Sequence, residues 1–126
     1  MDKKQSSEDY LERILMLQKE NPNKAIRAID IANSFSYSRP SVSIALKKLL
    51  DLEYVYYDDN QGIHLTEKGL MIASQTFEKH EIIGGLLIDI GVSSDTAYED
   101  ACKVEHYISD ETFEALKTLF YKKHNQ

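Results

Sequence analysis

Apolar and polar positions along this chain follow two different periods. Over most of its length, apolar side chains recur every three or four residues, which is typical of helices that bury one face. Residues 53–69 are the exception, because they hold two short strand-like runs around a cluster of turn residues. The pattern therefore predicts a mainly α-helical protein with one small β-hairpin.

The first repeat predicts an N-terminal helix. Ser6 or Ser7 is expected to cap it, and the proline-containing segment ENPN (20–23) is expected to end it. A short second helix should follow, and the polar segment NSFSYS (33–38) should break it. The apolar positions of these two helices are Leu11, Ile14, Leu15, Ile26, Ile29, Ile31 and Ala32.

A third helix is predicted to begin near Ser38. Pro40 falls in its first turn, where the missing N–H group costs little. Its inward stripe is predicted to be Val42, Ala45, Leu46, Leu49 and Leu50. The order helix, helix, turn, helix and hairpin is the layout of a winged helix-turn-helix, in which the second helix of the turn motif enters the DNA major groove. The alternative is an ordinary α-rich domain that does not bind DNA and whose charged third helix is simply exposed to solvent.

The C-terminal half predicts three more helices. Thr66 can cap a long helix that runs toward Ile83, and Gly84 and Gly85 should weaken or bend it. A fifth helix is expected over residues 95–107, and Ser109 should cap a sixth. The apolar positions of the fifth segment are Ala97, Ala101, Val104 and Ile108.

The charge distribution supports a DNA-binding helix although the total does not. The 15 Lys and Arg residues against 21 Asp and Glu give a net charge of −6, which by itself argues against a protein that coats nucleic acid. Residues 36–50, however, carry three cations and no acid. These cations lie in the third helix, and Arg39, Ser41, Ser43 and Lys47 fall opposite its apolar stripe.

Composition also bounds the location. No apolar run approaches the length of about 20 residues that a membrane span requires. The N-terminus lacks the apolar stretch of a secretory signal, and one cysteine cannot form an intramolecular disulfide. We therefore expect a cytoplasmic protein without a membrane partner.

The segment ACKVEH (101–106) points to a metal. Cys102, Glu105 and His106 stand at positions i, i+3 and i+4, which share one face of a helix, and all three are common ligand types. On the first helix Asp9 and Glu12 lie three apart, and the long helix carries His80. Each signal alone has a bland explanation, since cysteine is often simply buried and acidic pairs are usual at helix N-termini.

The sequence resembles the diphtheria toxin repressor / manganese transport regulator family of metal-dependent transcriptional repressors. The resemblance rests on the segments EDYLERIL, SRPSVSIALKKL, LTEKG, KHEIIGGLLIDIGV and DACKVEHYISDE. It implies a winged helix-turn-helix DNA-binding domain over residues 1–72 and a helical metal-binding and dimerisation domain over residues 73–126. It also implies the short form of the family, without an SH3-like domain.

The resemblance implies a set of site residues as well. The metal ligands would be Asp9, Glu12, His80, Cys102, Glu105 and His106. From the charge and the outward face of the third helix, we predict as DNA-binding residues Arg39, Pro40, Ser41, Ser43, Lys47 and Lys48. The partner would be a palindromic operator in double-stranded DNA, bound by a homodimer that controls metal homeostasis genes, with no small organic substrate.

Metal identity is open at this point. The manganese type carries a carboxylate where this chain has Cys102, whereas the iron type has a cysteine there; Gly84 and Tyr98 replace ancillary ligands of the iron type. Thiolate favours softer ions and the carboxylates favour harder ones. We expect Fe2+ or Mn2+ as the co-repressor, with Zn2+ or Co2+ able to bind in vitro.

Three rival functions remain. A winged-helix regulator could sense redox state through Cys102 instead of metal. A metal enzyme is disfavoured, because helical di-metal enzymes use Glu-x-x-His pairs and the segment 101–106 holds none. A metal buffer that never binds DNA is the third.

Overall fold

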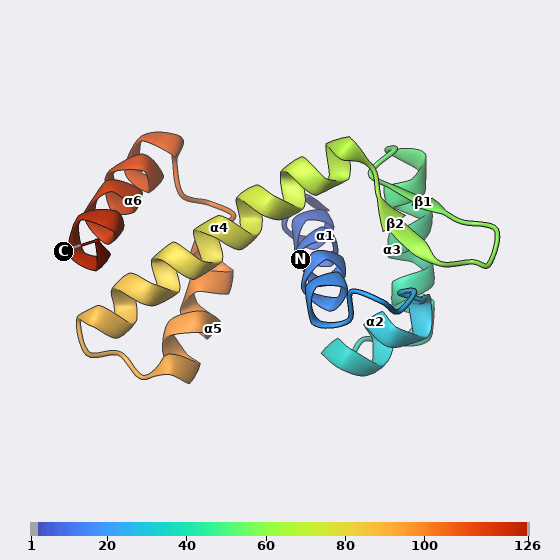
Figure 1. The fold of residues 1–126 in the computed structure, drawn as a ribbon, viewed down its shortest axis with the longest axis horizontal. Helices are drawn as coiled ribbons and strands as arrows, with labels where there is room; N and C mark the ends of the chain where they lie inside the picture. Colours follow the sequence, from blue (N-terminus) through green and yellow to red (C-terminus); the bar gives the residue numbers. More distant parts are fainter. Residues whose placement is uncertain (1–2, 126) are drawn as a thin grey trace. The chain divides into compact units, whose positions relative to one another are not determined.

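The computed structural model describes residues 3–125 and contains six helices and a two-stranded antiparallel sheet within them (Figure 1). The elements are α1 (Lys3–Glu20), α2 (Ala28–Phe35), α3 (Arg39–Asp51), β1 (Val55–Tyr57), β2 (Ile63–Leu65), α4 (Glu67–Asp89), α5 (Ser94–Val104) and α6 (Asp110–His124). They form two compact units, residues 1–74 and 75–126. A mainly helical fold with one hairpin is thus confirmed. Among the described helices, none is both long and apolar enough to span a bilayer.

The first unit is built around a core that α1, α2, α3 and the hairpin share. Leu11, Ile31 and Leu46 are each at most 2% exposed, and they come from the three helices in turn. Val55 and Ile63 add one buried side chain from each strand. Burying a side chain of this size stabilises the fold by about 1.5–3 kcal/mol, so the burial of these apolar side chains holds the three helices and the hairpin together.

Two helix boundaries in this unit differ from the sequence prediction. The first helix begins at Lys3, so Ser6 and Ser7 lie within it and neither caps it; Lys and Gln are good helix formers and extend the helix upstream. The second helix continues to Phe35, into the segment expected to break it. It ends where Ser36 takes a left-handed φ of 59° and donates its N–H to the Ala32 carbonyl.

The third helix begins as predicted. Ser38 is its N-cap, and its side-chain oxygen accepts a hydrogen bond from the Ser41 N–H at 3.2 Å. Pro40 lies in the first turn. Val42 and Leu46 are buried, as is Leu49, whereas Leu50 is 41% exposed. The prediction that Leu50 faces inward was therefore wrong, because it lies one helical step beyond the buried stripe.

The hairpin is tied to the rest of the first unit. Val55 pairs with Leu65 and Tyr57 with Ile63 in an antiparallel register. The N–H of Ile63 also donates to the Ile26 carbonyl at 2.7 Å, so the segment before α2 extends the small sheet. This pairing holds the hairpin against the helix-turn-helix.

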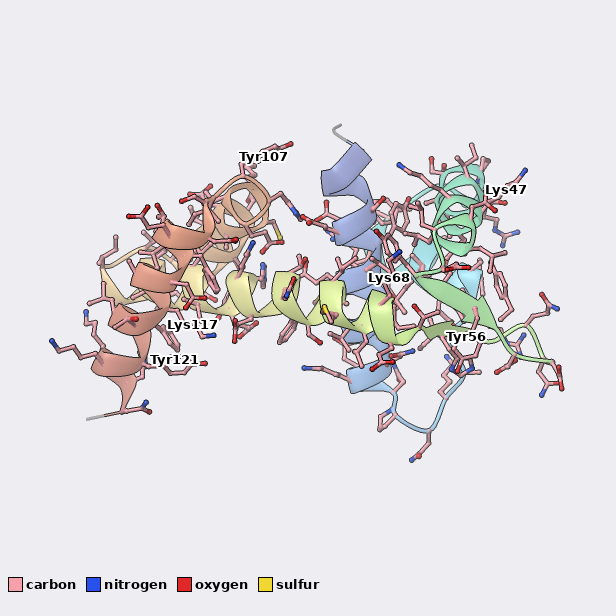
Figure 2. The ribbon with its side chains drawn as sticks, turned by 90° about the horizontal axis from the view of Figure 1, so that it is seen from above. Lys47, Tyr56, Lys68, Tyr107, Lys117 and Tyr121 are labelled. Carbon is pink, nitrogen blue, oxygen red and sulfur yellow. The ribbon has the colours of Figure 1, made fainter. Side chains whose placement is uncertain are left out.

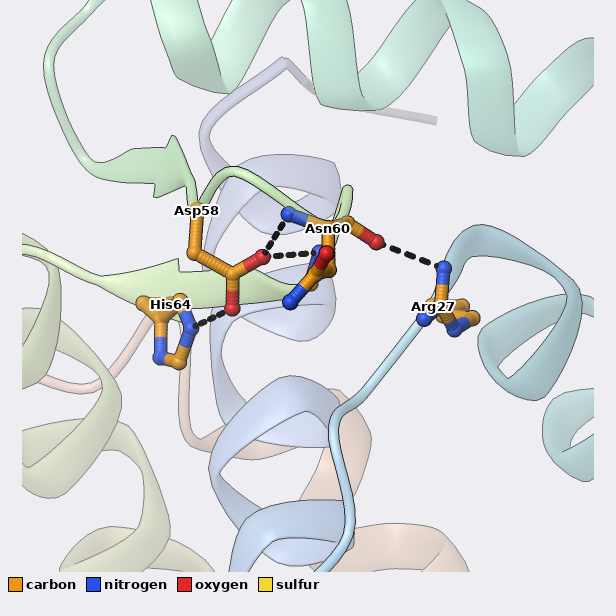
Figure 3. Close-up of polar contacts among 5 residues, drawn as sticks. Arg27, Asp58, Asn60 and His64 are labelled. Carbon is orange, nitrogen blue, oxygen red and sulfur yellow. Dashed lines mark hydrogen bonds and ion pairs between the residues drawn. The ribbon is translucent and has the colours of Figure 1, made fainter.

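Asp58 organises the hairpin turn (Figure 3). One of its carboxylate oxygens accepts hydrogen bonds from the N–H groups of Asn60 and Gly62, at 2.9 and 2.8 Å. The other lies 2.7 Å from Nε2 of His64. The guanidinium of Arg27 donates to the Asn60 carbonyl at 2.8 Å. The tip of the hairpin is therefore linked to the N-terminus of α2.

These contacts make the turn sensitive to acid. The hydrogen bond with His64, and then those from the Gly62 and Asn60 N–H groups, lower the pKa of Asp58 from 3.8 to about 2. Since the folded pKa lies below the unfolded one, ionised Asp58 stabilises the turn above about pH 4, and this contribution is lost as the pH falls toward about 2.

We expect Asp58→Asn to lower the urea midpoint of unfolding relative to the native protein at about pH 5, and this difference to shrink at about pH 3. Asp59→Asn, which changes an exposed neighbouring carboxylate, is the matched control and should leave the midpoint unchanged. A difference between the native protein and Asp58→Asn that is equal at both pH values would show that the charge of Asp58 does not stabilise the turn.

In the second unit α4 continues beyond Ile83, stays helical through both glycines, which were expected to weaken or bend it, and ends at Asp89. Because the two glycines have no side chain, aromatic rings from other helices pack directly against them. A Cβ atom on Gly84 would lie 2.5 Å from the Tyr98 ring, and one on Gly85 would lie 2.6 Å from the Phe120 ring. Close packing by α5 and α6 offsets the poor helix propensity of glycine here. The core of this unit contains Ile82, Leu86 and Phe113, with Ile108, Leu116 and Phe120 packed against it.

The fifth helix is shorter than predicted. It ends at Val104 instead of residue 107, and Glu105 is its C-cap. Val104, one of the apolar positions of this segment, is 43% exposed and does not join the buried face. Ala97 and Ala101, which are fully buried, make the packing face. Ser109 caps α6 as predicted, and its side-chain oxygen accepts from the Thr112 N–H at 3.2 Å.

Candidate metal centre and nucleic-acid interface

Three candidate ligands converge in the second unit. His80 lies on α4, Cys102 on α5, and Glu105 at the end of α5. One ligand atom from each lies within 4.8 Å of the others, a spacing that a single metal ion could bridge. The Sγ atom of Cys102 is 3.5 Å from Nδ1 of His80, and that nitrogen is 3.3 Å from Oε2 of Glu105.

The carboxylate of Glu105 is the centre of this cluster. Its side chain is 0% exposed, and a buried carboxylate is costly unless cationic or polar groups surround it. Oε1 lies 3.4 Å from Nε2 of His106, whose side chain is 1% exposed, and Oε2 faces His80. Within the described residues neither oxygen makes a hydrogen bond. The Glu105 carboxylate, the His80 imidazole and the Cys102 thiol are ligand types that suit a divalent transition metal, and His106 faces the other oxygen of Glu105.

The packing of α4 against α5 positions His80. The Tyr98 ring stacks on the His80 ring, with centroids 5.1 Å apart and planes inclined by 27°. Gly84 leaves the space that this ring needs. Burial, and then the nearby carboxylate of Glu81, raises the pKa of the Tyr98 hydroxyl. Sequence spacing could not reveal that Tyr98 supports the histidine, because the contact joins two different helices.

The end of α5 places the other two ligands. The sequence predicted that Cys102, Glu105 and His106 share a helical face, yet only Cys102 lies in regular helix. Glu105 keeps helical dihedral angles, φ −59° and ψ −24°, so its side chain still follows the α5 face. His106 lies in the turn that comes next and is buried there.

The remaining predicted ligands are Asp9 and Glu12, in the first unit. They lie three residues apart on α1 and are 7% and 2% exposed. Their participation in a site with the second unit stays a prediction. Two further histidines have other neighbours: His64 pairs with Asp58 at 2.7 Å, and His124 lies 2.8 Å from Asp89.

The predicted DNA-binding residues lie on the surface of α3. Five of the six are exposed and Lys48 is half-buried; the exposed ones are Arg39, Pro40, Ser41, Ser43 and Lys47. Lys47 projects from the helix in Figure 2, and Tyr56 lies on the hairpin. Sequence reasoning missed Ile44, which is 72% exposed on the same helix. Its helical spacing from Pro40 and Lys47 was the available signal.

Two protein-family models match the chain. Residues 4–63 match the N-terminal DNA binding domain of the iron dependent repressor, and residues 66–124 match its metal binding and dimerisation domain. The chain is 43% identical over 119 residues to the uncharacterized HTH-type transcriptional regulator MJ0568 of Methanocaldococcus jannaschii, covering 94% of each chain. It is 34% identical over 117 residues to the transcriptional regulator MntR of Escherichia coli, covering 93% of this chain and 74% of that protein.

The chain is also similar in fold to a solved structure. The manganese regulator SloR matches with a TM-score of 0.79 and 36% identity over 90% of this chain. The match covers 52% of SloR, so the chain spans about half the length of that regulator.

Proposed function

The chain belongs to the iron-dependent repressor family, and from this premise we propose that it is a DNA-binding transcriptional repressor with a divalent metal ion, Fe2+ or Mn2+, as its co-repressor. The observation that carries the proposal is the buried Glu105 carboxylate, which faces the ring nitrogens of His80 and His106 at 3.3 and 3.4 Å. Burying these ionisable groups costs free energy, and such clusters are typical of functional sites.

We propose that α3 binds the major groove of DNA. It is the second helix of the helix-turn-helix, and its outward side carries Arg39, Lys47 and the hydroxyls of Ser41 and Ser43. Cations there offset the net charge of −6 where phosphates would lie. The hairpin, held by Asp58 and Arg27, would lie against the DNA backbone.

The proposed ligand set is Asp9, Glu12, His80, Cys102, Glu105 and His106. When bound, the ion would supply positive charge that offsets the negative charge of the carboxylates in this set. Tyr98 holds the His80 ring in position, and the buried Ala97 and Ala101 fix α5 against its neighbours. Without the ion, carboxylates from α1 and α5 would repel one another if brought together, which would favour a loosely held DNA-binding domain.

We propose that residues 1–72 form the DNA-binding domain and that residues 73–126 form the metal-binding and dimerisation domain. A homodimer presents two copies of α3, which fits a palindromic operator whose half-sites are about 34–36 Å apart, one helical turn of DNA. Binding of the ion to one arrangement of the dimer would shift the population toward the state that matches this spacing.

A DNA-binding titration with different metals tests the proposal. The full chain is titrated onto a random-sequence duplex pool in Mn(II), in Fe(II) without oxygen, in Zn(II) and in chelator. We expect selective capture of a subset of sequences with Mn(II) or Fe(II) and its loss in chelator. Equal capture of the same sequences in chelator would refute metal dependence.

A redox regulator is the second candidate, because the Cys102 thiol lies 3.5 Å from His80 and is only half-buried.

Replacing the thiol with a carboxylate distinguishes the two functions. If the protein senses metal, we expect Cys102→Asp to keep metal-dependent DNA binding and to shift the relative affinity from Zn(II) toward Mn(II), since a carboxylate is a harder ligand than a thiolate. Competition between the two ions, followed by calorimetry, measures this shift. The redox function would be supported instead if peroxide, but not chelator, changed DNA binding by the native protein. In that case peroxide should have no effect on DNA binding by Cys102→Asp.

A further inference from the structure

The most exposed of the large apolar side chains on α3 is Ile44, at 72% exposure. Single apolar side chains on a protein surface are common and need no special explanation. The position of this one is informative. Val42 and Leu46 flank it in sequence and are buried, so Ile44 points to the opposite side of the helix.

The helical neighbours of Ile44 include a hydroxyl and two cations and no acidic group. Helical neighbours at i±3 and i±4 share one face, and for Ile44 these are Pro40, Ser41, Lys47 and Lys48. All four belong to the predicted DNA-binding set. From Arg39 to Leu50 the helix has no acidic residue. Ile44 therefore lies at the centre of a positively charged face, and the proposed function places this face against DNA.

A base-edge contact can explain an isoleucine at this place. The major groove presents hydrogen-bond donors and acceptors at every base pair, and an isoleucine satisfies none of them. The one apolar group on a standard base edge in that groove is the C5 methyl of thymine. The surrounding lysines favour a polyanion and disfavour an apolar protein partner, whose interface core would exclude such charges.

We propose that Ile44 contacts the C5 methyl of a thymine and thereby selects an A·T pair within each half-site. The inference rests on the proposed DNA-binding function and deepens it, because it names a residue that determines sequence specificity. The methyl group loses contact with water when Ile44 covers it, and the contact adds affinity only at sites that carry the methyl.

Deoxyuridine tests the contact, since it differs from thymidine only by the absent methyl. The protein, loaded with the ion that supports capture in the titration above, first selects duplexes from the random pool. Each thymine of the selected site is then replaced by deoxyuridine, one position per half-site at a time. We expect one position at which the native protein binds about four- to tenfold more weakly. Ile44→Ala should bind the two duplexes equally.

Controls separate this contact from other effects. Met71→Ala removes a similarly exposed apolar side chain from α4 and should keep the native response to deoxyuridine. Circular dichroism should show Ile44→Ala folded, as expected for an exposed position. Selected sites without a fixed thymine, or an Ile44→Ala protein with the native deoxyuridine response, would overturn the inference while leaving DNA binding intact. Failure of the native protein to capture any duplex would overturn the proposed function itself.

Discussion

Replacing Glu105 with glutamine is expected to abolish metal-stimulated DNA binding. The amide keeps the shape of the carboxylate but carries no charge, so the buried cluster loses the negative charge of its central ligand. Altering partners that only support a ligand already weakens metal binding by about 10- to 100-fold, and loss of the central ligand should weaken it by about 100-fold or more. Calorimetry with Mn(II) measures the metal affinity, and a gel-shift titration measures the affinity for DNA.

The matched control for this change is Glu99→Gln. Glu99 lies on the same helix, is 72% exposed and pairs only loosely with Lys103 at 3.9 Å. It should keep native metal and DNA affinities. Glu105→Gln should remain folded, because a neutral side chain is easier to bury than a charged one. If folded Glu105→Gln binds the ion and the selected duplex as the native protein does, the cluster around Glu105 is not the regulatory site.

Replacing Gly69 with alanine is expected to destabilise the first unit strongly. A Cβ atom there would lie 1.9 Å from the Tyr54 carbonyl oxygen, which is backbone and cannot rotate away. That oxygen is also held in place by the Thr66 N–H at 3.0 Å. The start of α4 must therefore separate from the start of the hairpin. We expect a loss of about 3 kcal/mol or more in the free energy of unfolding, measured by urea denaturation.

Ser74→Ala provides the comparison for Gly69→Ala, since it adds helix propensity at an exposed position of the same helix. It should leave the free energy of unfolding unchanged or slightly higher. A second effect should accompany Gly69→Ala. The Thr66 hydroxyl donates to the Glu53 carbonyl and accepts from the Gly69 N–H, so displacement of α4 would also loosen the end of α3. An unfolding free energy within about 0.5 kcal/mol of the native value would contradict the close approach.

Local sequence signals predicted the elements of the fold well where a residue acts on its own neighbours. Ser38 and Ser109 cap helices, as their spacing from the next apolar positions indicated. The cluster of turn residues between the two strand-like runs predicted the hairpin. The same reasoning failed at Gly84 and Gly85, where low helix propensity suggested weakness, because the packing rings of Tyr98 and Phe120 lie far away in sequence.

The ligand cluster shows the same division. Spacing alone brought Cys102 and Glu105 to one face of a helix, but it extended the helix past its real end at Val104. It could not show that His80 approaches Cys102 to 3.5 Å, although the two residues lie 22 positions apart in the sequence. Nor could it show that Glu105 is fully buried, which is the property that makes the cluster chemically significant.

The sequence by itself determined the order of helices and hairpin, the acid-free segment 36–50 and the family, because these depend on periodicity and on residue types at fixed short spacings. Only the tertiary structure decided which side chains are buried, which rings fill the space beside the glycines, and which nitrogen atoms face Glu105. These properties depend on contacts between segments that are distant along the chain, and their free energies come from desolvation and close packing, which no local pattern encodes.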